Sequence, residues 1–126
     1  MEYPYDPGGY DPPAPVVPMT IFRPFGPSGE RRQVRCLVDS GSDEVWLPEN
    51  QLQALGCLKI DRTEVEYADG STSWMPLYLV GMEVEGVVKE ALEGIGGKPE
   101  AGATIGRRVL NDFVVRLDGP RLTIQM

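Results

Sequence analysis

The sequence contains no histidine among its 126 residues. Triad-type serine and cysteine hydrolases use an imidazole as general base, and many zinc sites use imidazole ligands. The absence of histidine therefore excludes these hydrolases and the zinc sites that have histidine ligands. Only two cysteines are present, Cys36 and Cys57. Two are too few for a disulfide framework, and they lie too far apart in the sequence for a metal-binding motif. If the chain is a hydrolase, carboxylates must carry out the proton transfers.

Long hydrophobic runs and excess positive charge are also lacking. No apolar stretch approaches the roughly 18 residues of a membrane span, and the N-terminus lacks the basic start and apolar core of a signal peptide. A net charge of -7 argues against nucleic acid or an acidic membrane surface as a partner. We therefore expect a cytoplasmic protein that binds neither. With 41% apolar residues, a chain of this length forms one domain with a substantial core.

The first 18 residues are rich in proline, glycine and tyrosine. Proline removes backbone donors and glycine raises the entropy cost of ordering, so residues 1–18 are predicted to form a flexible, irregular or extended arm. Its tyrosines could dock on a surface or cleft, or the arm could be a solvated tail. The folded domain is predicted over residues 19–126.

Turn residues divide that domain into short strands. Gly26-Pro27-Ser28-Gly29 predicts a hairpin turn, and Asp69-Gly70 and Glu85-Gly86 break a longer alternating region. Pro48 begins and Gly56 ends a short helix. We expect strands over 19–25, 31–38, 44–47, 63–67, 73–84, 87–92, 103–106, 113–118 and 121–125, and helices over 48–56 and 107–112. Because strands far outnumber helices, the predicted fold class is all-β.

One turn carries potential chemistry, because an apolar strand delivers Asp39 into the sequence Ser40-Gly41-Ser42. Asp39 can take or give a proton, Gly41 permits close backbone approach, and the two serine hydroxyls can donate hydrogen bonds without adding charge. The alternative is an ordinary loop, in which these residue types are common.

Three motifs in order resemble the aspartic proteases. Asp39-Ser40-Gly41-Ser42, preceded by Leu37-Val38, resembles the Asp-Thr/Ser-Gly motif, and Thr104-Ile105-Gly106-Arg107-Arg108-Val109-Leu110 resembles the second motif. Tyr67-Ala68-Asp69-Gly70-Ser71-Thr72 lies where the flap hairpin of the family would be. From Ile21 to Gln125 the chain is most similar to the single-lobe, retropepsin-like members, including cellular and bacterial ones. The resemblance implies an all-β retropepsin-like half-barrel, with one short helix before the flap and one after the apolar-apolar-Gly motif.

The resemblance also implies the activity. One Asp-Ser-Gly triplet supplies one carboxylate, whereas acid-base hydrolysis of an amide needs two, so two copies would each contribute Asp39 to a homodimeric aspartic endopeptidase. The catalytic residues would be Asp39, Ser40 and Gly41, with Ser40 bonding across the dimer. The substrate would be a peptide or protein, and neither a cofactor nor a metal is implied.

Further roles follow by position in the family. Ser42 would donate to Asp39 and favour a more acidic working range, and Asp43 would pair with Arg107 beside the cleft. The apolar walls would come from Val45, Trp46 or Ile105, although Trp46 and Trp74 are expected mainly to pack. The predicted substrate-binding residues are Ser42, Asp43, Ala68, Asp69, Gly70 and Ile105, and the predicted structural supports are Gly106 and Arg107.

Gly94-Ile95-Gly96-Gly97 lies too close to the second motif to be the flap, and we expect a loop at the cleft wall there. Two other readings of the whole chain remain open. A catalytically silent homodimer of the same fold could bind peptides, and an unrelated small β-barrel could use Asp39 only as a turn residue.

Overall fold

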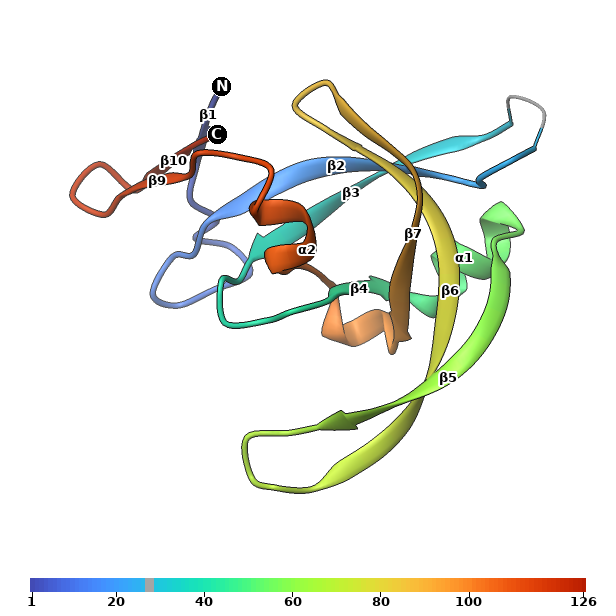
Figure 1. Ribbon diagram of the computed structural model, residues 1–126. Coiled ribbons are helices and arrows are strands. Elements are labelled where there is room, and N and C mark those ends of the chain that lie inside the picture. The colour runs from blue at the N-terminus through green and yellow to red at the C-terminus, as the bar shows by residue number, and fades with distance from the viewer. Residues whose placement is uncertain (27–28) are drawn as a thin grey trace.

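The computed structural model describes residues 1–26 and 29–126, and most of these lie in two β-sheets (Figure 1). The larger sheet closes on itself because β2 pairs with both β3 and β6. Its strands, in spatial order, are β2 (Val16–Phe22), β3 (Arg31–Val38), β8 (Ala103–Ile105), β4 (Val45–Pro48), β7 (Val87–Gly97), β6 (Thr72–Val84) and β5 (Leu58–Glu66).

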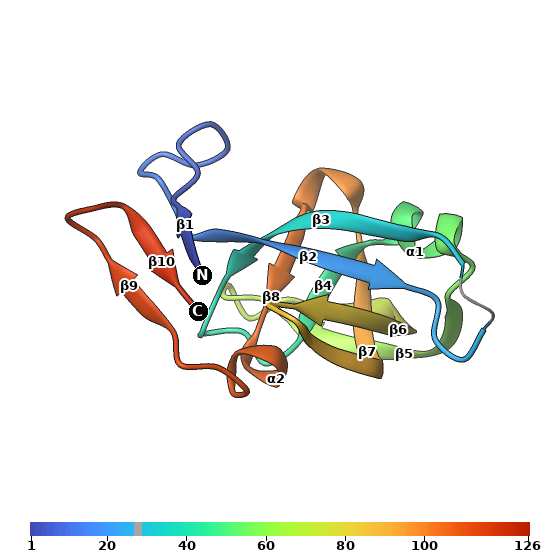
Figure 2. The ribbon, with the colours of Figure 1, turned by 90° about the horizontal axis from the view of Figure 1, so that it is seen from above.

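The smaller sheet has three strands and lies beside one end of the barrel (Figure 2). In spatial order these are β1 (Glu2–Pro4), β10 (Thr123–Gln125) and β9 (Arg116–Asp118). The helices are α1 (Glu49–Leu55), α2 (Arg107–Leu110) and the 3-10 helix η1 (Pro99–Ala101). The predicted all-β class, with one short helix before the β5–β6 hairpin and one after Gly106, is confirmed. Within the described ranges, no helix has the length and hydropathy that crossing a membrane requires.

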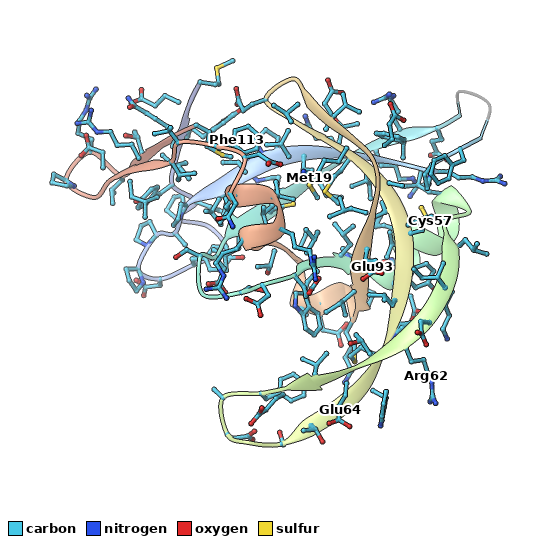
Figure 3. The ribbon with its side chains drawn as sticks, in the orientation of Figure 1. Met19, Cys57, Arg62, Glu64, Glu93 and Phe113 are labelled. Atoms are coloured by element: carbon cyan, nitrogen blue, oxygen red, sulfur yellow. The ribbon has the colours of Figure 1, made fainter. Side chains whose placement is uncertain are left out.

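The core forms where alternate side chains of the barrel strands point inward. In β2, Val17, Met19 and Ile21 are buried while the residues between them are partly exposed, as the period-2 geometry of a strand requires (Figure 3). Leu52 and Leu55 of α1 join the same apolar cluster. Gly56 ends α1 in the left-handed conformation at φ 76°, as its position in the sequence predicts.

Two parallel pairings connect distant segments. β3 pairs with β8 so that Val38 lies opposite Ile105, and β4 pairs with β7 so that Trp46 lies opposite Ile95. The end of β3, which carries Asp39, is therefore held beside the start of α2.

The prediction of a loop at Gly94-Ile95-Gly96-Gly97 is wrong. These residues form the last part of β7 and are buried. At two of them a side chain would crowd a neighbouring aromatic ring. A Cβ at Gly96 would lie 3.0 Å from the Tyr78 ring, and one at Gly97 would lie 3.3 Å from the Trp46 ring. The glycines allow β4, β6 and β7 to pack closely.

The N-terminal segment differs from the predicted arm. β1 pairs with β10, Asp6 bridges to Ala14, and β2 begins at Val16, inside the predicted arm. The hydroxyl of Tyr3 also donates to the carboxylate of Glu85. Backbone pairing and burial of Val16 therefore order parts of a segment that its proline content suggested would be irregular. Of the predicted turn at 26–29, residues 27 and 28 lie outside the described part of the chain.

Candidate active site

Asp39 lies directly after β3, in a tight turn that backbone hydrogen bonds hold. Its N–H donates to the carbonyl of Ile105 at 3.0 Å, and its own carbonyl accepts from the N–H of Ser42 at 3.2 Å. Its Oδ1 accepts from the N–H of Gly41 at 2.9 Å. The carboxylate is half-buried and orients toward its own turn, whereas Ser40 is exposed. The prediction of an acid presented in a turn after a strand is confirmed.

The predicted role of Ser42 is wrong in this structure. Its hydroxyl donates to the carbonyl of Glu44 at 3.2 Å, and the recorded donor to the Asp39 carboxylate is the Gly41 N–H. The expected effect of Ser42 on the working pH range therefore has no hydrogen bond to support it.

The N-terminal end of α2 packs against the chain that follows Asp39. The N–H groups of Arg107 and Arg108 donate to the carbonyls of Ser42 and Asp43 at 2.8 and 3.1 Å. A Cβ at Gly106 would lie 2.4 Å from the carbonyl oxygen of Glu44, a distance that backbone atoms do not tolerate. Only glycine fits at this position, which agrees with the predicted structural role of Gly106.

Two ion pairs strengthen the same contact. Arg107 pairs with Asp43, as expected, and Arg108 pairs with Glu44 at 2.8 Å. The hydrogen bond that Arg108 donates to the Glu44 carboxylate is the main cause that raises the pKa of Arg108 above its usual value. The Arg108 pair was not predicted, although the adjacent charges in Asp43-Glu44 and Arg107-Arg108 are a signal that could have indicated it.

A cleft of about 680 Å³ lies between the Asp39 turn and the β5–β6 hairpin. Its lining includes Asp39, Asp43 and Trp46 on one side and Val65, Tyr67 and Ala68 on the other. A recess of about 180 Å³ beside Asp39 is lined by Asp39, Ser42, Trp46, Ala101, Gly102 and Thr104.

Two predicted wall residues are not at the cleft. Val45 and Ile105 are both 0% exposed and belong to the core. Because side chains alternate along a strand, Thr104 and Trp46 face the opening in their place. Trp46 therefore lines the cleft, although the sequence predicts mainly a packing role for it.

The hairpin joining β5 and β6 projects from the barrel and curves below it (Figure 1). At its tip the Tyr67 N–H donates to the Ser71 carbonyl at 2.8 Å, and Gly70 has a positive φ of 85°. Asp69 accepts from the Ser71 hydroxyl at 2.5 Å, and this bond is the largest cause that lowers the pKa of Asp69. Of the three predicted tip residues, Ala68 lines the cleft, while Asp69 and Gly70 are exposed beyond its lining.

The two thiols lie away from the cleft. Cys36 is buried in the core, and this burial raises its pKa to about 12. Among the residues that the structure describes, no group of three or more carboxylate or thiol side chains is placed to hold a metal ion.

Comparison with solved structures places this geometry among known folds. EIAV protease, solved in complex with the inhibitor HBY-793, aligns over 79% of this chain and 86% of its own, with a TM-score of 0.56 and 16% identity. A retropepsin-like aspartic protease from Rickettsia conorii aligns over 86% of this chain and 90% of its own, with a TM-score of 0.57 and 18% identity. No protein-family model and no curated protein sequence matches. The chain therefore has the retropepsin-like fold.

Proposed function

We propose that this protein is an aspartic endopeptidase whose active site forms between two copies of the chain. One observation carries the proposal. In a retropepsin-like fold, the Asp39-Ser40-Gly41 turn places a half-buried carboxylate at a cleft covered by a projecting hairpin. The turn, the cleft and the hairpin together suit a polypeptide held in extended form above Asp39.

The proposed chemistry needs two carboxylates with different protonation. The ionised Asp39 of one copy takes a proton from a water molecule, whose oxygen attacks the carbonyl carbon of the scissile amide. The protonated Asp39 of the other copy donates to the carbonyl oxygen as negative charge develops there. The Asp39 that took the proton from water then gives it to the amide nitrogen, and the other Asp39 takes back the proton of the former carbonyl oxygen as the C–N bond breaks, which releases an amine and a carboxylic acid. Two carboxylates at contact distance share one proton, so activity should have a bell-shaped dependence on pH.

The small sheet offers a surface for the second copy. Its strand order is β1, β10, β9, so β9 pairs with β10 on one side only among the described strands. Leu117 of β9 is 57% exposed and Val114, just before it, is 90% exposed. Edge strands with exposed apolar side chains readily pair with another chain. We infer that β9 contributes to the dimer contact.

Reduced and denatured casein, incubated between mildly acidic and neutral pH, tests the proposal. Wild-type protein should cleave it, and Asp39→Asn should lower the rate by several orders of magnitude while remaining folded and dimeric in the ultracentrifuge. Asp11→Asn is the control, because it makes the same change at an exposed site outside the cleft.

Cleavage that persists in Asp39→Asn would overturn the mechanism. A dimer that binds casein without cutting it would favour the silent peptide-binding protein of the same fold. A monomer at every concentration would remove the paired-carboxylate site.

A further inference from the structure

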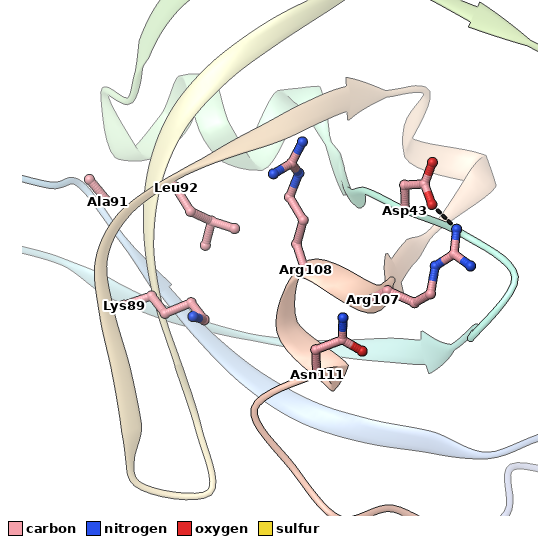
Figure 4. Close-up of a pocket in the computed structure, with 7 residues that line it drawn as sticks. All are labelled: Asp43, Lys89, Ala91, Leu92, Arg107, Arg108 and Asn111. Carbon is pink, nitrogen blue, oxygen red and sulfur yellow. Dashed lines mark hydrogen bonds and ion pairs between the residues drawn. The ribbon is translucent and has the colours of Figure 1, made fainter.

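A second groove lies on the far side of Asp43 from the catalytic turn. Its volume is about 690 Å³, and it opens between β7 and α2 (Figure 4). We call it the Lys89 groove, and it is lined by Asp43, Lys89, Ala91, Leu92, Arg107, Arg108 and Asn111.

The lining of the Lys89 groove has more positive than negative side chains, although the whole chain carries a net charge of -7. Three of its lining side chains are positive and one, Asp43, is negative. Lys89 reaches it from β7, and Arg107 and Arg108 reach it from α2 (Figure 4). Leu92 and Ala91 supply an apolar part of the lining, and Asn111 supplies an amide.

Each cation already pairs with one carboxylate, but its side chain stays partly exposed to solvent. Arg108 donates to Glu44 through Nε at 2.8 Å, Lys89 pairs with Asp112 at 2.5 Å, and Arg107 pairs with Asp43. The side chains of Arg107 and Arg108 are 51% and 55% exposed. Because a guanidinium carries five N–H donors and an ammonium carries three, both kinds of side chain can bind a further carboxylate.

The Lys89 groove adjoins the cleft, because Asp43 lines both. Glu44 also lies at their boundary, since it lines the cleft while its carboxylate bonds to Arg108 of the groove. A polypeptide extended beyond the cleft would therefore meet the cations of the groove next.

We propose that the Lys89 groove binds acidic side chains of the polypeptide substrate, on the residues that flank the segment held in the cleft. This inference rests on the proposed function for the identity of its ligand. In a symmetric dimer each copy supplies one groove, so acidic residues should be favoured on both sides of the scissile bond.

Cleavage of a diverse peptide library measures this preference directly. A chymotryptic digest of a bacterial proteome supplies the peptides, and mass spectrometry identifies the new ends. Wild-type protein should enrich Asp and Glu at flanking positions by roughly two- to fivefold, the range for exposed ion pairs. Lys89→Met should reduce this enrichment, and Lys89→Glu should abolish it.

Lys59→Glu is the matched control, because Lys59 is exposed on β5 and lines neither the cleft nor the groove. Its profile should equal that of wild type. Absence of acidic enrichment in wild type, or equal profiles for Lys59→Glu and Lys89→Glu, would overturn the proposal.

A binding measurement separates the groove from catalysis. Two fluorescein-labelled peptides share the centre Ala-Val-Phe-Leu-Val-Ala and carry either Glu-Glu or Lys-Lys at both ends. Fluorescence anisotropy on Asp39→Asn protein should show tighter binding of the glutamate peptide than of the lysine peptide. Adding Lys89→Glu to this protein should abolish the difference in affinity, whereas adding Lys59→Glu should leave it unchanged. Physiological salt is used, because it screens long-range repulsion from the acidic chain more than contact pairs.

The outcomes distinguish the two proposals. If casein is cut but neither assay shows an acidic preference, the groove proposal fails alone. If casein is not cut but the glutamate peptide binds in a Lys89-dependent way, the proposed endopeptidase fails and the groove stands. If neither occurs, both fail.

Discussion

Arg108 donates from Nε to the carboxylate of Glu44 at 2.8 Å, one residue along from the pair between Arg107 and Asp43. These pairs tie α2 to the chain that follows Asp39. Both are largely exposed, so each contributes only about 0–1 kcal/mol to the stability of one copy. Because the two pairs contribute similar amounts to stability, the loss of one pair is a control for the loss of the other.

Arg107→Ala should weaken dimerisation more than Arg108→Ala, although each variant loses one exposed ion pair. The reason is that the resemblance implies a place for the Arg107 pair beside the cleft, at the edge of the proposed contact between two copies. Sedimentation equilibrium measures the dimer dissociation constant of both variants. Urea denaturation measures how much stability each single copy loses with its ion pair. Equal dimer dissociation constants would remove the special role of Arg107.

Gly106→Ala should destabilise the fold by roughly 1–3 kcal/mol, as overpacking usually does. The added methyl group would meet the carbonyl oxygens of Ser42 and Glu44 at 2.5 and 2.4 Å, and backbone atoms cannot rotate away. Urea denaturation measures the free energy of unfolding. Gly119→Ala is the control, because a Cβ there has nothing within 4 Å. A destabilisation no larger than that of Gly119→Ala would contradict the close packing of α2.

Leu117→Lys should raise the dimer dissociation constant at least tenfold, because lysine on an edge strand discourages pairing with another chain. Analytical ultracentrifugation measures it, and proteolysis of casein should fall in parallel. Leu58→Lys is the matched control on β5, since Leu58 is 66% exposed and Leu117 is 57% exposed. Equal effects of the two variants would place the dimer contact elsewhere.

Cys36 should resist alkylation in the folded protein. Burial raises its pKa from 9.0 to about 12, so at about pH 8 the thiol is protonated and the nucleophilic thiolate is scarce. Mass spectrometry after iodoacetamide treatment should find Cys36 unmodified in native protein and modified in concentrated guanidinium chloride. Because the folded pKa is the higher one, stability from the protonated thiol is complete below pH 9 and is lost as pH rises toward 12. Rapid native labelling of Cys36 would show that the core opens.

Local signals in the sequence were sufficient to predict the turns, including the turn that carries Asp39. Gly56 ends α1, Glu85-Gly86 joins β6 to β7, and the Asp39 turn follows an apolar strand, all as expected. Each depends on backbone preferences of a few adjacent residues. The order of the three motifs then indicated the fold.

Features that depend on distant partners could not be predicted in the same way. Gly94-Ile95-Gly96-Gly97 has the composition of a loop, and only its parallel pairing with β4 makes it a strand. Ile105 and Thr104 are adjacent, and which of them faces the cleft is decided by the register of β8 against β3. A one-residue change of register would exchange their positions. The order of the N-terminal segment likewise depends on β10, at the other end of the chain.

The parallel pairing of β3 with β8 also sets when the Asp39 turn can form. The hydrogen bond from the Asp39 N–H to the Ile105 carbonyl joins residues from opposite halves of the chain, and such long-range contacts form late because closing a long loop is entropically costly. During synthesis, Asp39 leaves the ribosome well before its partner strand. The Asp39 turn of a nascent chain is therefore incomplete until β8, in the last third of the polypeptide, has been made, and the proposed protease should become active only then.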